Sequence, residues 1–169
     1  MKKLTPVDLD IISELIRNSR QSDRELAKKL GVSQPTVGRR RVVLEKEGLL
    51  DYTAIPDLEK LGFEILAFTL ARWSFNKERR VEERREFVGK HPSIMFASTG
   101  SGLDNDRVCI SIHKNYSDYT KFIQELRGEF GEYFEAFSSF IVSLKGDDIL
   151  RHLTFNYLAE LLKQGKTQE

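Results

Sequence analysis

The segment GVSQPTVGRRRVVLEKEG, residues 31–48, concentrates side chains that could contact a polyanion. Ser33, Gln34 and Thr36 offer hydrogen-bonding groups near its start, and three consecutive arginines follow at residues 39–41. Arginine pairs with phosphate oxygens or with the edge of a guanine, and short polar side chains at a helix N-terminus can reach bases. These residue types predict contact with a nucleic acid, provided that one helix presents them together.

Helix start and stop signals precede the basic segment. Thr5 before Pro6 is a typical helix start, because the hydroxyl can cap free amides and proline needs no amide partner. Ser22 and Glu25 form the spacing of a capping box, which predicts a second start. Gly31, a residue suited to a left-handed C-cap, ends this second helix.

The third predicted helix begins at a Ser33 cap, tolerates Pro35 in its first turn and ends at Gly48. Only Gly31 and Val32 lie between the second and third helices, so the two must meet at a sharp angle. Three helices with such a tight second connection are typical of the helix-turn-helix, whose recognition helix enters the major groove of DNA.

A helical wheel divides the third helix into two sides, with Val37 and Leu44 on the core side. The outward positions are Pro35, Arg39, Val42 and Lys46, flanked by Thr36, Gly38 and Val43. Gly38 costs about 1 kcal/mol of helix stability relative to alanine, which we interpret as room for a DNA groove. The alternative is a solvated helix whose arginines serve solubility alone. We predict DNA contacts from Ser33, Gln34, Thr36, Gly38, Arg39, Arg40, Val42 and Val43.

The distribution of charge agrees with a polyanion partner for the first third of the chain. Residues 1–50 hold 11 basic and 7 acidic residues, a net charge of +4, whereas the remaining residues sum to −3. The single cysteine, Cys109, excludes an internal disulfide and a multi-cysteine zinc site. We find no signal peptide and no apolar run of transmembrane length, so we expect a cytoplasmic protein without membrane contact.

The rest of the chain predicts a mixed α/β arrangement. Its hydrophobic periods predict strands over residues 64–73, 93–99, 107–113 and 136–145, and helices over residues 77–90 and from Ser117 onward. The order βαββαβ is that of the ferredoxin-like sandwich, so the fold class is α+β. A final helix is expected from Leu150, Leu153, Tyr157, Leu158, Leu161 and Leu162.

The strand over residues 64–73 carries apolar side chains on both faces, with Leu66, Phe68 and Leu70 on one of them. Two helices can cover only one face of the sheet. We expect the uncovered face from Ile65, Ala67, Ala71, Trp73 and Ile141. A symmetric homodimer would bury that face on both copies and would deliver two recognition helices to two half-sites.

These elements predict three parts: a helix-turn-helix domain over residues 1–50, a wing or hinge linker over 51–62, and a ferredoxin-like domain with the C-terminal helix over 63–169. In the linker, an extended stretch precedes Pro56, and one helical turn is expected from Asp57 to Gly62.

The residues LTPVDLDIISEL, RELAKKLGVSQPTVGRR, LEKEGLL, YTAI and KLGF resemble the Lrp/AsnC family of feast/famine regulators. The resemblance covers essentially the whole chain; beyond residue 62 it depends on the order of elements and on STG at Ser98 to Gly100. It implies a winged helix-turn-helix, an effector-binding and oligomerisation domain, and homodimers that often build octamers. The implied partners are double-stranded DNA and an amino acid or other small-molecule effector. Separately, we expect no metal and no cofactor.

The chain departs from the family pattern at Arg41, where an aliphatic residue is usual in line with Val37 and Leu44. Either the Arg41 stem is buried while its guanidinium reaches solvent, or the helix is rotated so that Val42 takes over part of the packing.

The turn after the second strand is another departure. In the family, an aspartate normally follows the glycine by three positions, near which the effector binds between dimers; here Leu103 has that position. We expect effector binding at Gly100, Ser101, Gly102, Asp104 and Asp106. The alternative is that Gly100 and Gly102 only allow a hairpin turn.

An enzyme is the rival class, because siroheme decarboxylases pair the same two domain types. However, His91, His113 and His152 show no metal-ligand spacing, and no nucleophile-base pair is suggested. We therefore expect no catalytic residues. A regulator that binds a protein partner without DNA contact is the third possibility.

Overall fold

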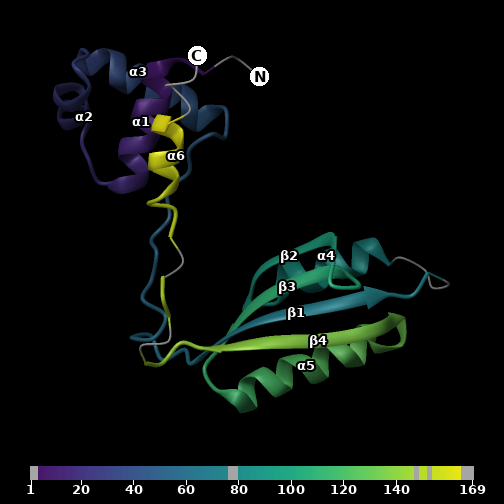
Figure 1. The fold of residues 1–169 in the computed structure, drawn as a ribbon. Helices are drawn as coiled ribbons and strands as arrows, with labels where there is room; N and C mark the ends of the chain where they lie inside the picture. Colours follow the sequence, from purple (N-terminus) through teal and green to yellow (C-terminus); the bar gives the residue numbers. More distant parts are fainter. Residues whose placement is uncertain (1–3, 76–79, 147–148, 152–153, 165–169) are drawn as a thin grey trace. The chain divides into compact units, whose positions relative to one another are not determined.

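The computed structural model describes residues 4–75, 80–146, 149–151 and 154–164 of the 169-residue chain. The chain divides into two compact units, Met1–Ile55 with Arg151–Glu169 and Pro56–Leu150. We call them the helical unit and the sheet unit, after the elements that Figure 1 shows in each. The C-terminal segment thus belongs to the helical unit. The sequence pattern instead assigns it to the ferredoxin-like domain, residues 63–169.

Helices with strong end signals form the N-terminal part of the helical unit: α1 (Pro6–Arg17), α2 (Asp23–Leu30) and α3 (Gln34–Lys46). Thr5 and Ser22 cap their helices as the sequence predicts; Ser22 forms the predicted capping box with Glu25, and Thr5 forms one as well, with Asp8. Gly31 ends α2 in the left-handed conformation, with φ of 66°, and Ser33 caps α3. The tight α2–α3 connection therefore gives the predicted helix-turn-helix.

The core of the helical unit draws on all three of these helices. It consists of Ile11, Leu15, Leu26, Ala27, Val37 and Leu44. Ile11, Leu26 and Val37 have no solvent-accessible surface at all. Full burial of such side chains stabilises a fold by about 1.5–3 kcal/mol each, so the helix-turn-helix has a substantial core of its own.

A further helix, α6 (Leu158–Gln164), packs against α1. Ala159 is fully buried there, and the Ser13 hydroxyl donates a hydrogen bond of 2.9 Å to its carbonyl oxygen. Of the residues expected in this helix, Tyr157 precedes it and Leu150 is 99% exposed, while Leu153 lies outside the described residues. The C-terminal segment joins the helical unit because a small side chain and a serine allow the two helices to approach.

Residues 51–57, the first part of the expected wing, form neither helix nor strand. The predicted turn follows, because the Asp57 carboxylate accepts a hydrogen bond of 3.1 Å from the Lys60 amide, and Gly62 adopts a φ of 84°. The boundary between the two units falls in this linker, between Ile55 and Pro56.

The sheet unit has the predicted order of elements: β1 (Ile65–Trp73), α4 (Val81–Lys90), β2 (Ile94–Gly102), β3 (Asn105–His113), α5 (Tyr116–Phe130), a 3-10 turn (Gly131–Tyr133) and β4 (Phe134–Ser143). The strands are antiparallel in the order β2-β3-β1-β4, which confirms the ferredoxin-like fold. No described helix is long and apolar enough to span a bilayer; α5, with 15 residues, is the longest.

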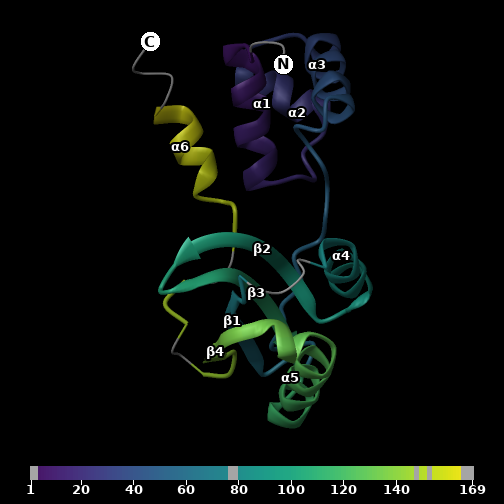
Figure 2. The same cartoon turned by 90° about the vertical axis from the view of Figure 1, so that its right-hand side faces the viewer.

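Both helices of the sheet unit lie on one face of the sheet (Figure 2). That face is formed by Ile65, Ala67, Thr69, Ala71 and Trp73, all of which are buried. Ile65 and Ala67 pack against Tyr119 of α5, and Trp73 lies beside Phe130. The expectation that Ile65, Ala67, Ala71 and Trp73 face away from the helices is therefore wrong. It is wrong for Ile141 too, because this residue pairs with Ala67 and paired residues share a face. Both faces of β1 are apolar, so alternation alone did not distinguish them.

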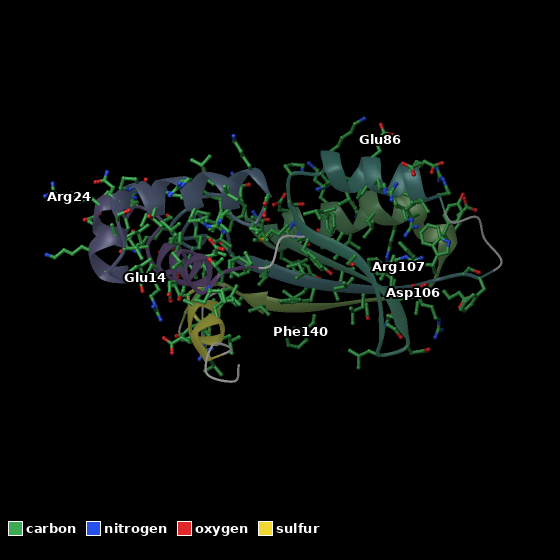
Figure 3. The ribbon with its side chains drawn as sticks, turned by 90° about the horizontal axis from the view of Figure 1, so that it is seen from above. Glu14, Arg24, Glu86, Asp106, Arg107 and Phe140 are labelled. Atoms are coloured by element: carbon green, nitrogen blue, oxygen red, sulfur yellow. The ribbon has the colours of Figure 1, made fainter. Side chains whose placement is uncertain are left out.

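The uncovered face of the sheet carries the alternate residues. Phe68 of β1 pairs with Ile110 of β3 and with Phe140 of β4, and paired residues share a face. We define the open sheet face as Leu66, Phe68, Leu70, Phe96, Val108, Ile110, Ile112, Phe140 and Val142. None of these is buried, and Phe140 is 72% exposed. Figure 3 shows Phe140 extending from β4 on the side away from α4.

Candidate nucleic-acid interface

Helix α3 has one buried side and one exposed side. Val37 and Leu44 are buried, as the helical wheel predicts. The exposed residues of α3 are Gln34, Pro35, Arg39, Val42, Glu45 and Lys46, and the Glu45 carboxylate is paired with Arg41. Val42 is 48% exposed although it is aliphatic. The outer side of α3 therefore combines two positive charges with short or apolar side chains, a surface that can enter a groove without steric obstruction.

The N-terminus of α3 carries the predicted polar groups. Ser33 Oγ accepts a hydrogen bond of 3.3 Å from the Thr36 amide, and its hydroxyl lies 2.7 Å from that of Thr36. Gln34 is exposed. The first turn of a helix also presents unsatisfied amides and a partial positive charge, which favour an anion such as a phosphate.

Arg40 is committed to an internal ion pair. Its Nε donates to Asp8 Oδ1 at 2.6 Å and its Nη2 to Asp8 Oδ2 at 2.5 Å, a bidentate arrangement. Asp8 is fully buried and lies in the first turn of α1, 32 residues earlier in the chain. Arg40 thus joins α3 to α1, rather than standing free on the outer side.

The environment of Asp8 favours its ionised form. Burial raises the pKa of this carboxyl, but hydrogen bonds from Arg40 and Thr5 outweigh burial and leave the pKa below its ordinary value. Asp8 also completes the capping box of α1 by accepting from the Thr5 amide at 2.7 Å. One carboxylate therefore serves both a helix cap and the α1–α3 contact.

Arg41 is held by a second set of partners. Its guanidinium pairs with Asp23 at 3.1 Å and Glu45 at 3.3 Å, and Nε donates to Tyr52 Oη at 2.8 Å. The same guanidinium lies 5.0 Å from the centre of the Tyr52 ring. The guanidinium thus stays at the surface while Val42 remains exposed, which supports the first of the two alternatives for Arg41.

Gly38 has a packing role within the helix-turn-helix. A Cβ atom at this position would lie 3.0 Å from Asp23 Oδ2, so a side chain there would displace the carboxylate that holds Arg41. The glycine allows the first turn of α2 to approach the middle of α3. This contact explains Gly38 without an approaching DNA backbone.

Arg39 differs from its two neighbours. It is exposed, and within the described part of the chain it is the member of the arginine run that has no ion-pair partner. Arg24 and Lys28 are also exposed cations, one turn apart on α2, and neither is among the DNA contacts predicted from the sequence. Their spacing of four residues puts both on the same side of the first helix of the helix-turn-helix, and this spacing could have identified them from the sequence. Figure 3 shows Arg24 pointing away from α2.

The five residues expected to bind an effector lie together in the β2–β3 hairpin. Leu103 and Asp104 form its two-residue turn with φ of 50° and 58°, and Gly102 pairs with Asn105. The Asp104 carboxylate accepts from Arg72 of β1, and Asp106 Oδ1 accepts from the Trp73 amide at 2.9 Å. A hairpin is thus observed, but its left-handed residues are Leu103 and Asp104 rather than Gly100 and Gly102. Effector binding at the five residues stays a prediction.

The two described histidines, His91 and His113, lie within hydrogen-bonding distance of other side chains of the sheet unit. His113 is buried beside the Ser111 hydroxyl, 2.9 Å from Nε2, and burial lowers its pKa. His91 lies 3.1 Å from Glu125 and 2.8 Å from Ser93, and His152 lies outside the described residues. Among the described side chains, no group of three or more His, Cys, Asp or Glu residues is arranged to hold a metal ion.

The fold and the exposed cationic side of α3 define a helix-turn-helix DNA-binding protein. The AsnC-type helix-turn-helix domain matches residues 4–45. The HTH-type transcriptional regulator Ptr1 of Methanocaldococcus jannaschii is 32% identical over 125 residues, which cover 72% of this chain and 80% of Ptr1. The uncharacterized HTH-type transcriptional regulator PYRAB00690 of Pyrococcus abyssi is 40% identical over 73 residues, which are 43% of this chain and 49% of that protein.

A solved structure extends the similarity in fold to most of the chain. The transcriptional regulator NMB0573 from Neisseria meningitidis, crystallised as an L-Met complex, has a TM-score of 0.76 at 21% identity. The match covers 92% of this chain and 99% of that one. The match to the AsnC-type domain and the identity with Ptr1 show that the chain belongs to the Lrp/AsnC family of helix-turn-helix transcriptional regulators, as its sequence predicted.

Proposed function

We propose that the protein regulates transcription in the cytoplasm by inserting α3 into the major groove of specific operator DNA. The observation that carries this proposal is the outer side of α3, where Gln34, Arg39 and Val42 are all exposed and Arg39 has no ion-pair partner in the described structure. We assign direct contact with DNA to these three, together with Ser33, Thr36 and the half-buried Val43.

Two further predicted contacts receive a different role in this proposal. Arg40 and Gly38 maintain the position of α3 through Asp8 and Asp23, so their effect on DNA binding is indirect. The exposed cations Arg24 and Lys28 are added as phosphate contacts, because the first helix of a helix-turn-helix crosses the DNA backbone.

We also propose that the protein is a homodimer, and that such dimers can assemble into octamers. The open sheet face supports the dimer, because it is a mainly apolar surface that contains the exposed side chains of Phe96 and Phe140. A two-fold axis through such a face carries two copies of α3, which matches an operator with two half-sites.

A small metabolite is proposed to modulate DNA binding. The complex of NMB0573 with L-Met supports this proposal, since that protein shares the fold. The β2–β3 hairpin, with Gly100, Ser101, Gly102, Asp104 and Asp106, is the predicted site in a dimer–dimer contact. Membership of a family of transcriptional regulators supports a regulator rather than an enzyme.

The test is selection of bound fragments from random duplex DNA, followed by fluorescence anisotropy on the enriched duplex and on a scrambled duplex. We expect an enriched pseudo-palindrome with half-sites about one helical turn apart. The enriched duplex should bind at least about 10³-fold more tightly than the scrambled one at physiological salt. Equal affinity for the two duplexes would contradict a sequence-specific regulator.

A further inference from the structure

A cavity of about 340 Å³ lies within the sheet unit, between the helix-covered face of the sheet and α4. This volume is within the range of small-molecule sites in proteins and exceeds that of packing defects. None of the five hairpin residues predicted to bind an effector lines it. It is therefore a different place from the predicted effector site.

The walls of the cavity are mainly aromatic and aliphatic. Trp73, Phe87, Phe130 and Phe137 contribute rings from β1, α4, α5 and β4. Helix α4 has no buried residue, and Val81, which lines the cavity, is 38% exposed. The apolar side of α4 is therefore incompletely packed against the sheet, and an apolar ligand would remove that surface from water.

The charged groups that line the cavity are all positive. They are Arg84, Arg85 and Arg107, and no aspartate or glutamate is among its described lining residues. The guanidinium carbons of Arg84 and Arg107 lie 4.7 Å and 5.8 Å from the centre of the Trp73 ring. Such a combination of an aromatic wall and guanidinium groups suits a ligand with an apolar body and one negative charge.

Arg107 supplies a hydrogen-bond donor that no described residue accepts from. Its Nη1 pairs with the Asp106 carboxylate at 2.8 Å, but its buried Nε has no hydrogen-bond partner in the described structure. A buried unsatisfied donor is costly, so an anionic oxygen of a ligand would be favoured beside it. Two residues further along β3, burial raises the pKa of the Cys109 thiol to about 11, so this lining thiol stays neutral and behaves as an apolar group.

We propose that this cavity binds a hydrophobic monocarboxylate without an amino group, such as an arylacetic acid or a branched-chain 2-oxo acid, and that this class supplies an effector. An amino acid is disfavoured because its ammonium group would meet three arginines and no carboxylate among the described lining residues. The regulatory part of this inference rests on the proposed DNA-binding function, whereas the binding part does not.

Trp73 provides the direct measurement, because it is the single tryptophan of the chain and lines the cavity. Its fluorescence should change saturably when the full chain is titrated with phenylacetate. Phenethylamine carries the same ring with a positive charge, and L-phenylalanine carries it with a positive and a negative charge. Each should bind at least about tenfold more weakly than phenylacetate. Equal binding of all three would overturn the proposal, because the arginines would then not select the charge.

Variants locate the binding site. Arg107→Gln should weaken phenylacetate binding about tenfold, since it removes the charge and the guanidinium donor. Lys121→Gln is the control, because Lys121 is an exposed α5 cation outside the cavity lining, and it should bind like the wild type. Ala97→Phe should abolish binding by filling the cavity from β2.

Circular dichroism and thermal melting establish whether each variant is folded. If Arg107→Gln does not fold, Ala97→Phe and the comparison of phenylacetate with phenethylamine and L-phenylalanine remain as the tests. Undiminished phenylacetate binding by Ala97→Phe would overturn the proposal. The titrations contain no DNA, so an absence of phenylacetate binding would not contradict the proposed DNA binding. Likewise, a failure to select a specific duplex would not contradict ligand binding in the cavity. Phenylacetate is then added to the anisotropy assay, where a change in DNA affinity that Ala97→Phe lacks is expected.

Discussion

The helical unit and the sheet unit differ in how completely each buries its apolar side chains and pairs its charged ones. In the helical unit, the core residues Ile11, Leu26 and Val37 are fully buried, and two of three consecutive arginines have carboxylate partners. In the sheet unit, Phe140 remains 72% exposed on one face, and a cavity persists on the other. The helical unit thus has a packed core and an exposed cationic surface. The sheet unit has exposed apolar surface that a second molecule could bury.

The comparison is tested most strongly by Arg40→Ala. Removing this arginine leaves the fully buried Asp8 carboxylate without its bidentate partner, and such losses cost about 3–5 kcal/mol. Urea denaturation followed by circular dichroism should show this decrease in the free energy of unfolding. The matched control is Arg39→Ala, which should change stability by no more than about 0.5 kcal/mol because Arg39 is exposed. Equal stability of the two variants would contradict the distinct roles assigned to these neighbours.

The next largest effect is expected from Phe140→Asp on the open sheet face. A charge in the centre of an apolar interface should weaken the proposed dimer by at least about 2 kcal/mol, or roughly 30-fold in Kd. Sedimentation equilibrium over a range of protein concentrations measures this. Phe75→Asp serves as control, because Phe75 is 92% exposed but lies outside the sheet. A wild-type chain that stays monomeric at every concentration would refute the dimer.

A smaller effect is expected from Arg39→Ala in DNA binding. Loss of one phosphate or base contact should reduce affinity for the selected duplex by about 1 kcal/mol, roughly fivefold. If the contact is to phosphate, the slope of log affinity against log salt should fall by about 0.9. Arg20→Ala removes an equal charge from the exposed α1–α2 connection and should bind like the wild type. Unchanged affinity and slope in Arg39→Ala would exclude direct contact by this residue.

The smallest expected effect is a dependence of stability on pH. The folded-state pKa of Asp8 lies below its ordinary value of 3.8. Its ionised form therefore contributes stability that is fully present above that ordinary value and is lost as pH falls through the folded-state pKa. The difference in unfolding free energy between wild type and Asp8→Asn should shrink below about pH 4. A difference that stays constant from pH 7 to pH 3 would show that Asp8 does not titrate in this way.

Much of the fold could be predicted because its signals are local. The Thr5 cap, the Ser22 capping box and the left-handed Gly31 act within about one helical turn, so their residue types are sufficient. The order of the sheet unit followed from changes in hydrophobic period along the chain. The position of α3, and the burial of Val37 and Leu44, followed from the helical repeat.

The candidate interface was predicted only in part, because adjacent arginines look alike in a sequence. Arg39, Arg40 and Arg41 differ only in what the fold places beside them: solvent, the buried Asp8, and Asp23 with Tyr52. Gly38 likewise suggested close approach by another surface, and that surface is the carboxylate of Asp23.

The sequence by itself determined the helix-turn-helix, the βαββαβ order and the family, since caps, turns and periodicity depend on neighbours within a few residues. Only the tertiary structure decided which arginine stays free, which face of β1 the helices cover, and that α6 returns to α1. Each of these depends on contacts between residues far apart in the chain, such as Arg40 with Asp8 or Ser13 with Ala159, whose energies exist only once the chain has folded.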